Sequence, residues 1–233
     1  ILIGQKIPVV ITSAGNPNTW TAKLKSSGSI VMHVVSSVKF AIKAEKSGVD
    51  AIVAEGFEAG GHNGREETTT MVLVPLIKKV IKLPLIAAGG IASGASMLAA
   101  ISLGADGVQI GSRFVASHEA SSHINFKNAI ISAEQGSTIL TLKDLTPVRI
   151  MKNKFYEEIT DLYSIGASSQ KISNHLGKGR AKIGMFEGDL DRGELEIGQV
   201  SSQINKIKYA KEIIDEIIDE YDQILNILSQ QRI

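Results

Sequence analysis

The first half of the chain alternates short apolar runs with segments of helical spacing, and this alternation constrains the fold more than any other feature. The apolar runs are rich in Val, Ile and Ala and lack polar alternation; they are 8–12, 30–35, 51–54, 85–88 and 107–110. Such continuous runs are typical of parallel strands that are covered on both faces. Helical spacing marks 37–47, 71–81 and 93–103, with Gly48 and Gly104 as C-terminal stops. The alternation predicts βα units and a parallel sheet.

Two architectures are built from such units, a closed (β/α)8 barrel and an open doubly wound sheet. Small or polar residues follow nearly every predicted strand, among them Gly15, Ser36 and Gly56. A barrel gathers all of these loops at one face, whereas an open sheet uses mainly the loops at its switch point. We therefore expect a TIM (β/α)8 barrel. Five strands cannot close it, so we expect the last five βα units here and about three more upstream of Ile1.

The pattern changes in the second half of the chain. We expect residues 1–150 to form the C-terminal part of the barrel and residues 151–233 to form a helical and irregular extension packed on it. Residues 173–198, rich in Gly and charge, are expected to be irregular. Residues 206–228 have the apolar stripe of a long amphipathic helix, which we expect to pack on the domain surface. The alternative is a contact with a partner or, in a homodimer, with a second copy.

Composition excludes several classes of function. The 25 basic and 24 acidic residues give a formal net charge of +1, which offers no support for a nucleic-acid-binding surface. Cysteine is absent, so there is no disulfide, thiolate metal site or cysteine nucleophile. No apolar run approaches the roughly 20 residues of a membrane helix, and no signal peptide is visible. We expect a cytoplasmic protein that contacts neither membrane nor nucleic acid.

A loop rich in glycine follows the apolar run 51–53 and contains His62. Glycine lets the backbone turn sharply and approach a ligand, and histidine exchanges a proton near neutral pH. We interpret residues 54–64 as the mouth of an active site, with His62 as the acid–base candidate; the alternative is a histidine that only bridges the loop. Glu55, at the end of the strand, could accept hydrogen bonds from a ligand. The other histidines are scattered, so no metal site is expected, and His33, within a strand, is expected to be packed.

Two later loops have the composition of phosphate sites. In the first, Gly89 and Gly90 turn after a strand and Ser93 is a good N-cap. In the second, Gly111 and Ser112 follow a strand. Free backbone N–H groups at such turns bind phosphate well; the alternative is that these glycines only permit tight turns. No G-x-G-x-x-G follows a strand and no P-loop is present, so neither a Rossmann site nor a P-loop is indicated.

Taken in order, these motifs resemble the nitronate monooxygenase and enoyl-[acyl-carrier-protein] reductase II family, FMN-dependent flavoproteins on a TIM barrel. The segments that carry the resemblance are 12–17, 54–64, 68–71, 84–94, 104–114, 147–154, 187–189 and 198–199. The resemblance implies that Glu55, Gly60 and Gly61 contact the flavin and that His62 is the active-site histidine. The residues that it implies for the FMN ribityl phosphate are Gly89, Gly90, Gln109, Ile110, Gly111 and Ser112. It also implies that three upstream strands supply further FMN contacts.

Glu55 distinguishes the two activities of this family. Nitronate-oxidising members usually have Gln at this position, so the resemblance favours the enoyl reductase. The implied reaction is reduction of trans-2-enoyl-acyl-carrier-protein by NADH or NADPH in fatty-acid synthesis. The alternative is oxidation of alkyl nitronates with O2, with His62 as the base. A third hypothesis is a flavin- or phosphate-binding module without activity. Asn63 departs from the apolar residue that usually follows this histidine.

Overall fold

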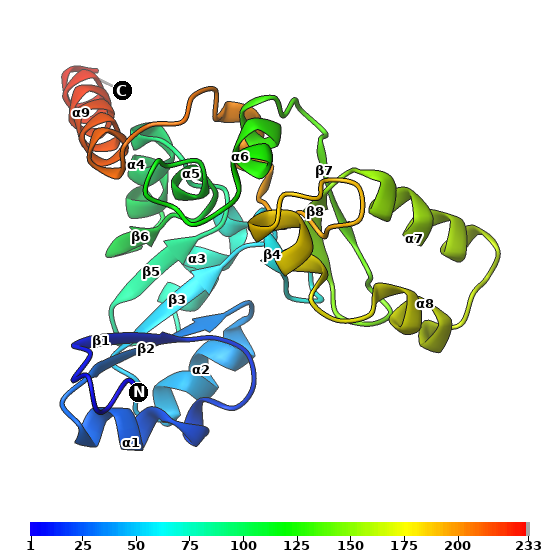
Figure 1. The fold of residues 1–233 in the computed structure, drawn as a ribbon. Coiled ribbons are helices and arrows are strands. Elements are labelled where there is room, and N and C mark those ends of the chain that lie inside the picture. Colours follow the sequence, from blue (N-terminus) through cyan, green and yellow to red (C-terminus); the bar gives the residue numbers. More distant parts are fainter. Residues whose placement is uncertain (232–233) are drawn as a thin grey trace.

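Five parallel strands form the main sheet in the order β1–β2–β3–β5–β6. Their bounds are β1 Val9–Thr12, β2 Ile30–Val35, β3 Ala51–Glu55, β5 Leu85–Ala88 and β6 Gly107–Gln109. The computed structural model describes residues 1–231. All five predicted strands are confirmed. Because neighbours in the sheet follow chain order without a reversal, the sheet is part of a barrel rather than a doubly wound sheet. It remains open, so the barrel is partial (Figure 1).

The helices predicted between the strands are confirmed. They are α2 Val38–Lys46, α3 Thr70–Lys78 and α4 Gly94–Ser102, and a short α1 at Thr21–Ser26, which follows the 3-10 turn Pro17–Thr19, was not predicted. Ser37 caps α2, and Ser93 forms a reciprocal capping box with Ser96 at the start of α4. Gly48 and Gly104 have φ angles of +80° and +103°, as expected for residues that end a helix.

The main core lies between the sheet and the helices on its outer face. Val31, Ile52, Leu73 and Ile77 are among its fully or almost fully buried side chains. The opposite face is open at β1 and β2, where the side chains of Val9, Ile11 and Ile30 are 43%, 50% and 50% exposed. The expectation that every strand is covered on both faces is therefore wrong for these two strands. The reason is that five strands do not curl far enough to cover their own inner face.

A second lobe is built on an antiparallel sheet of order β4–β8–β7, to the right in Figure 1. Its strands are β4 Gly61–His62, β7 Thr138–Thr141 and β8 Val148–Met151, and helices α7 Lys154–Ser164 and α8 Ser169–Leu176 cover it. The side chains of its separate core are Leu142, Val148, Ile150, Phe155, Ile159 and Ile172. Since β4 belongs to the glycine–histidine loop, this loop joins the two sheets. Position 150 lies within β8, and the division of the chain there stays a prediction.

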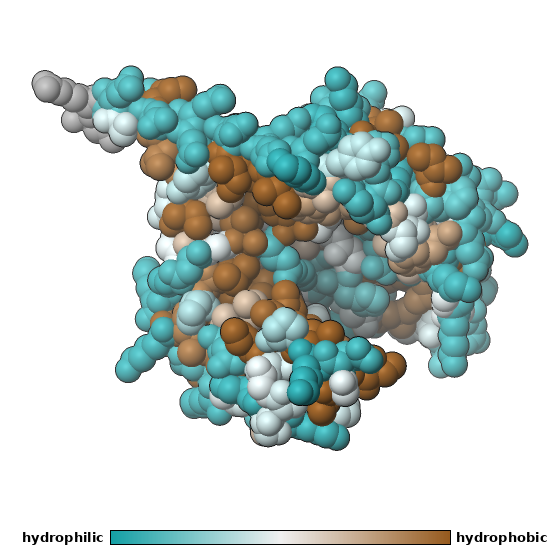
Figure 2. Space-filling model, turned by 60° about the vertical axis from the view of Figure 1, so that its left-hand side comes forward, coloured by the Kyte–Doolittle hydropathy of each residue, from teal (hydrophilic) through white to brown (hydrophobic). Residues whose placement is uncertain are grey.

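The remaining elements connect the lobes and end in one long helix. They are α5 Ser112–Val115, α6 Ile124–Ile131, a π-helical turn at Lys182–Phe186, a 3-10 turn at Gln199–Gln203 and α9 Ala210–Gln230. Residues 173–198, expected to be irregular, contain the end of α8 and the π-helical turn. The long helix is confirmed, and it packs on α4 through Ile213 and Ile217. Its last turns project from the body (Figure 2), and Leu225, Ile227 and Leu228 are exposed on them.

Within residues 1–231, no helix combines the length and the apolar character required to cross a membrane.

Candidate active site

The loop after β3 is fixed to the start of α3 by Glu58. Both carboxylate oxygens of Glu58 accept the backbone N–H of Thr70 at 3.0 Å, and Oε2 also accepts the Thr70 hydroxyl at 3.0 Å. A carboxylate at this position satisfies an N-terminal amide of the helix and complements its dipole. Glu58 therefore has a structural partner and is not free to act on a ligand.

The glycines of this loop are required by a distant segment of the chain. A methyl group added at Gly60 would lie 2.4 Å from the carbonyl carbon of Ile197. One added at Gly61, whose φ is +78°, would lie 2.8 Å from Oε2 of Glu196. Gly60 thus needs glycine because the backbone of residues 197–198 passes directly against the loop, whereas Gly61 needs it for its positive φ, since the Glu196 carboxylate is the end of a flexible side chain. The sequence predicted that a ligand would approach the backbone closely here. At these two positions the close neighbour is instead the segment 196–198 of the same chain.

A cavity of about 230 Å³ lies where the carboxyl ends of β3, β5 and β6 meet this loop. The predicted cofactor residues that line it are Glu55, Gly60, Gly89, Gly90, Gln109, Gly111 and Ser112. Residues of the later connections complete the wall, among them Val115, Met185 and Val200. Gly61 and Ile110 do not line the cavity; Ile110 packs instead against the main core. The two predicted phosphate loops therefore share one cavity.

Several backbone donors of this cavity are unpaired. Within residues 1–231, the N–H groups of Gly90, Ile91 and Gly111 donate no hydrogen bond to another protein group. A methyl group added at Gly111 would have no atom within 4 Å, so there is open space on that side of the residue. The Ser112 hydroxyl, in contrast, accepts the Gly198 amide at 2.9 Å. Unpaired backbone amides at the lining of a cavity can bind an anionic oxygen such as that of a phosphate.

Glu55 is one of three glutamates that line this cavity, with Glu58 and Glu196. It ends β3, where neighbouring main-chain and side-chain atoms remove it from water, and this burial raises its pKa to about 7. Among the described residues, no Lys or Arg lines the cavity. Near neutral pH a substantial fraction of Glu55 is therefore uncharged, and this fraction reduces the repulsion that an anionic ligand would meet.

His62 lies outside this cavity. It is exposed on β4, opposite Val148, and it lines two neighbouring cavities of about 400 and 170 Å³. Glu55 borders both the first cavity and the one of about 400 Å³, so these two share a wall. His33 also lines the larger cavity but is 5% exposed, with Nδ1 2.7 Å from the Thr12 hydroxyl. The prediction that His33 is a packed, hydrogen-bonded residue is confirmed.

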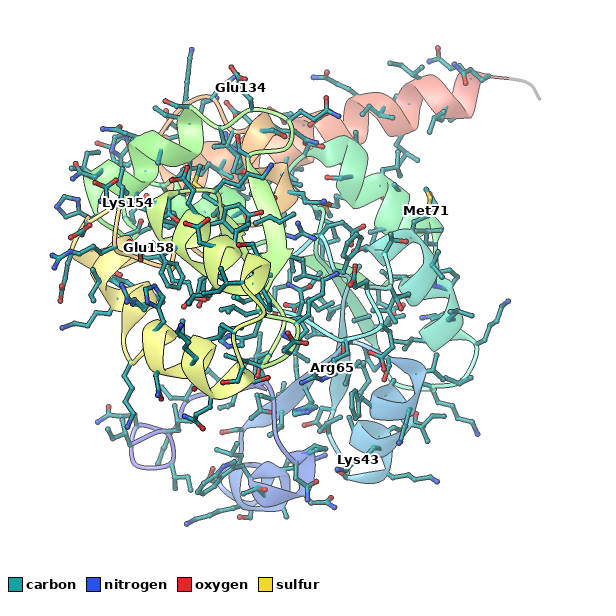
Figure 3. The ribbon with its side chains drawn as sticks, turned by 90° about the vertical axis from the view of Figure 1, so that its right-hand side faces the viewer. Lys43, Arg65, Met71, Glu134, Lys154 and Glu158 are labelled. Carbon is teal, nitrogen blue, oxygen red and sulfur yellow. The ribbon has the colours of Figure 1, made fainter. Side chains whose placement is uncertain are left out.

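Basic residues near the site do not form a patch. Arg149 is buried, donates two hydrogen bonds to the carbonyl oxygen of Phe57 at 3.0 and 2.8 Å, and lies over its ring. Lys154 points away on the exterior of α7, near Glu158 (Figure 3). Arg65, labelled between the lobes in Figure 3, donates to the carbonyl oxygens of Lys143 and Leu145. Arg149 and Arg65 thus bind carbonyl oxygens of the fold and Lys154 lies on the exterior, so these three residues form no basic patch.

Two acidic residues of the site were missed by the sequence analysis. Glu196 lines the first cavity and Glu194 lines the cavity of about 170 Å³ beside His62. They belong to the run Glu194-Leu195-Glu196-Ile197, whose strict alternation is the signal of a half-buried extended segment. The segment lies within residues expected to be irregular, so this part of the site was not predicted.

Comparison with known proteins gives a consistent family. The profile of the family described as nitronate monooxygenase matches residues 1–220. A probable nitronate monooxygenase of Staphylococcus aureus (strain MRSA252) is 34% identical over 234 residues, which cover 96% of this chain and 65% of the relative. The chain thus spans about two thirds of the length of that relative.

Solved structures agree with the fold. FabK from Thermotoga maritima superposes with a TM-score of 0.92 and 39% identity over 98% of this chain and 72% of its own. Nitroalkane oxidase from Streptomyces ansochromogenes, at 24% identity, superposes with a TM-score of 0.81 over 97% of this chain and 67% of its own. The second likeness is one of fold alone.

Proposed function

Because this chain belongs to the nitronate monooxygenase family, we propose that it carries the flavin-phosphate site and the active-site histidine of an FMN-dependent oxidoreductase. The proposed reaction is reduction of trans-2-enoyl-acyl-carrier-protein by NADH or NADPH in fatty-acid synthesis. The observation that carries the proposal is the cavity of about 230 Å³ with the unpaired amides of Gly90, Ile91 and Gly111. The proposed setting is the cytoplasm, with the acyl-carrier protein as partner and a homodimer as the assembly.

The residues of the cavity fit the phosphate end of FMN. Residues of two separate loops whose amides have no protein acceptor line one cavity, and a methyl group at Gly111 would meet no atom within 4 Å. Backbone N–H groups bind a phosphate without requiring Lys or Arg, as at other helix and turn termini. Glu55, at the border with the larger cavity, would then stand beside the flavin ring. The chemistry that FMN supplies when bound is hydride transfer between a reduced nicotinamide and the enoyl thioester.

The protein's own groups would orient the substrate and move a proton. His62 is exposed to the cavity of about 400 Å³, which Glu55 joins to the first cavity. An imidazole there can donate the proton that the α-carbon of the thioester requires, with the proton replaced from solvent. Glu55 at a pKa of about 7 can donate a hydrogen bond as an acid or accept one as a carboxylate.

The second candidate is nitronate oxidation. It is favoured by the description of the family and by the name of the Staphylococcus aureus relative. In that reaction His62 would act as a base. Glu55, in the position where nitronate-oxidising members usually have Gln, and the likeness to FabK at 39% identity support the enoyl reductase instead.

Steady-state kinetics separates the two candidates. The protein is saturated with FMN, and oxidation of NADH or NADPH is followed with a crotonyl thioester; oxygen uptake is followed in parallel with an alkyl nitronate. Nicotinamide oxidation that depends on the thioester supports the enoyl reductase. Oxygen uptake with the nitronate alone selects nitronate oxidation. If the protein binds FMN but shows neither thioester-dependent nicotinamide oxidation nor oxygen uptake with the nitronate, both enzymatic candidates are contradicted. The result would then support a flavin-binding module.

A further inference from the structure

Glu194 is a buried carboxyl that lines the cavity of about 170 Å³ beside His62. The residue is 7% exposed, and within residues 1–231 its side chain accepts no hydrogen bond and forms no ion pair. Polar groups that are removed from water are normally hydrogen-bonded, because burial without a partner costs free energy. The carboxyl of Glu194 therefore has its hydrogen-bonding capacity left for a ligand in the cavity.

The fold fixes the position of Glu194 through the backbone. Its N–H donates to the carbonyl oxygen of Arg180 at 3.1 Å. The next residue, Leu195, accepts the N–H of Met151 at 2.8 Å and is buried in the core beside α6. Side chains alternate along such an extended segment, so Glu194 projects on the opposite face from Leu195. The carboxyl is thus part of a wall that is held at both neighbouring residues.

Arg180 lines the same cavity and has hydrogen-bond donors to spare. Its Nε, Nη1 and Nη2 each donate one hydrogen bond to a backbone carbonyl oxygen, at 2.9, 2.9 and 2.8 Å, in Leu176, Arg192 and His175. A guanidinium has five N–H groups, so two of them donate to no protein group within the described part of the chain. These two can donate to an oxygen of a ligand.

The charges that line this cavity favour an uncharged ligand. Burial, and then the charge of Glu196, raise the pKa of Glu194 to about 7, although the charge of Arg180 lowers it. His62 is the third titratable residue of the lining. Arg180 repels a cation, and Glu194 repels an anion whenever it is ionised. A ligand without a net charge avoids both repulsions.

The rest of the lining is mainly aliphatic, with side chains from Leu142, Leu145, Val148 and Leu176. An acceptor at Glu194, donors at Arg180 and an aliphatic wall are together complementary to an amide on a short carbon chain. The amide N–H meets the carboxyl, its carbonyl oxygen meets the guanidinium, and its carbons lie along the leucines. A volume of about 170 Å³ holds a group of several heavy atoms rather than a single water.

We propose that this cavity is a subsite for an uncharged amide: Glu194 accepts the amide N–H, and Arg180 donates to the amide carbonyl oxygen. The inference rests on the proposed function, because His62 borders both this subsite and the cavity of about 400 Å³ in which the thioester would meet the imidazole. Two reactants of that reaction carry an amide. One is the chain that joins the thioester to the acyl-carrier protein, and the other is the nicotinamide of the reductant.

A matched pair of probes tests the recognition of an amide without any turnover. The first probe is the butanoyl thioester of N-acetylcysteamine, which contains one amide; the second has an ester oxygen in place of the amide N–H. Chemical-shift titrations of the protein, with and without FMN, give the affinity for each probe. A site that accepts a hydrogen bond from the N–H rejects the analogue that lacks it, so the amide should bind at least about tenfold more tightly.

Substitution of Glu194 locates this preference. Glu194→Met removes the acceptor at similar size and should reduce the preference for the amide to less than about threefold. A buried carboxyl without a partner does not support the fold, so the variant should fold. Glu194→Gln retains an acceptor oxygen and should keep part of the preference. Glu134→Met, on the exterior of the molecule (Figure 3), is the matched control and should keep all of it.

Three outcomes of the titrations overturn the inference. They are equal affinity of the wild-type protein for the two probes, an unchanged preference for the amide in Glu194→Met, and no binding of the amide probe.

Steady-state kinetics of the FMN-loaded enzyme assigns the amide to one of the two reactants. If it belongs to the thioester, Glu194→Met should raise the KM for the crotonyl thioester of N-acetylcysteamine at least about tenfold and leave the KM for NADH unchanged. If it belongs to the nicotinamide, the KM for NADH should rise instead. An active variant in which neither KM changes overturns the inference. A wild-type protein without turnover contradicts the proposed function, and the two probes still decide whether the cavity binds an amide.

Discussion

Replacing Glu55 with Gln should stabilise the protein at alkaline pH and leave its stability unchanged in acid. Burial raises the pKa of Glu55 from 4.5 to about 7, so the folded state holds this proton more tightly than the unfolded state. Below pH 4.5 Glu55 is protonated in both the folded and the unfolded state, so its burial does not lower the free energy of unfolding. Between 4.5 and 7 stability falls as pH rises, and above 7 the full cost is reached. At 1.36 kcal/mol for each unit, that cost is about 3 kcal/mol.

The assay is urea denaturation of wild type and Glu55→Gln, without added flavin, near pH 4.5 and near pH 8.5. We expect equal free energies of unfolding at the lower pH and a gain of up to about 3 kcal/mol for the variant at the higher one. Glu134→Gln, at an exposed carboxyl, should stay within about 0.5 kcal/mol of wild type at both. A difference between wild type and Glu55→Gln that does not grow with pH would refute the burial of this carboxyl.

Three further substitutions probe the site and the second lobe. Gly60→Ala places a methyl group 2.4 Å from the carbonyl carbon of Ile197 and should lower the free energy of unfolding by about 2 kcal/mol or more in urea; a neutral effect would contradict the packing of the loop. The methyl group added in Gly111→Ala meets no atom within 4 Å, so the free energy of unfolding should change by less than about 0.5 kcal/mol. The affinity for FMN, measured by fluorescence quenching, should fall about tenfold. Unchanged affinity would place the flavin elsewhere. Phe155→Ala removes a fully buried ring beneath the Arg180 guanidinium and should cost about 3–5 kcal/mol, whereas Ile165→Ala, 68% exposed, should be nearly neutral; similar losses would contradict the separate core of this lobe.

The βα half of the molecule was predictable because its signals are local. Apolar runs such as 51–54 define buried strands, and capping residues such as Ser93 with Gly104 define the ends of a helix. Local signals also place Gly90 and Gly111 directly after two predicted strands. Because these strands are neighbours in the sheet, the two glycines line one cavity.

The second lobe and the acidic part of the site were not predictable in this way. The strand β4 has two residues, and its pairing with β8 joins positions more than 80 residues apart, so no local pattern reveals it. The closeness of Glu196 to Gly61 depends on that pairing. The function of Glu58 was hidden for a similar reason, because only the folded loop brings its carboxylate to the Thr70 amide.

The most direct measurement compares the affinity of the purified protein for FMN and for riboflavin, which share the ring system and differ in the phosphate. If the unpaired amides of Gly90, Ile91 and Gly111 hold the phosphate, FMN should bind at least about 100 times more tightly, as two charge-assisted hydrogen bonds would provide. Equal affinity for the two flavins, or no binding of FMN, would contradict the assignment of this cavity.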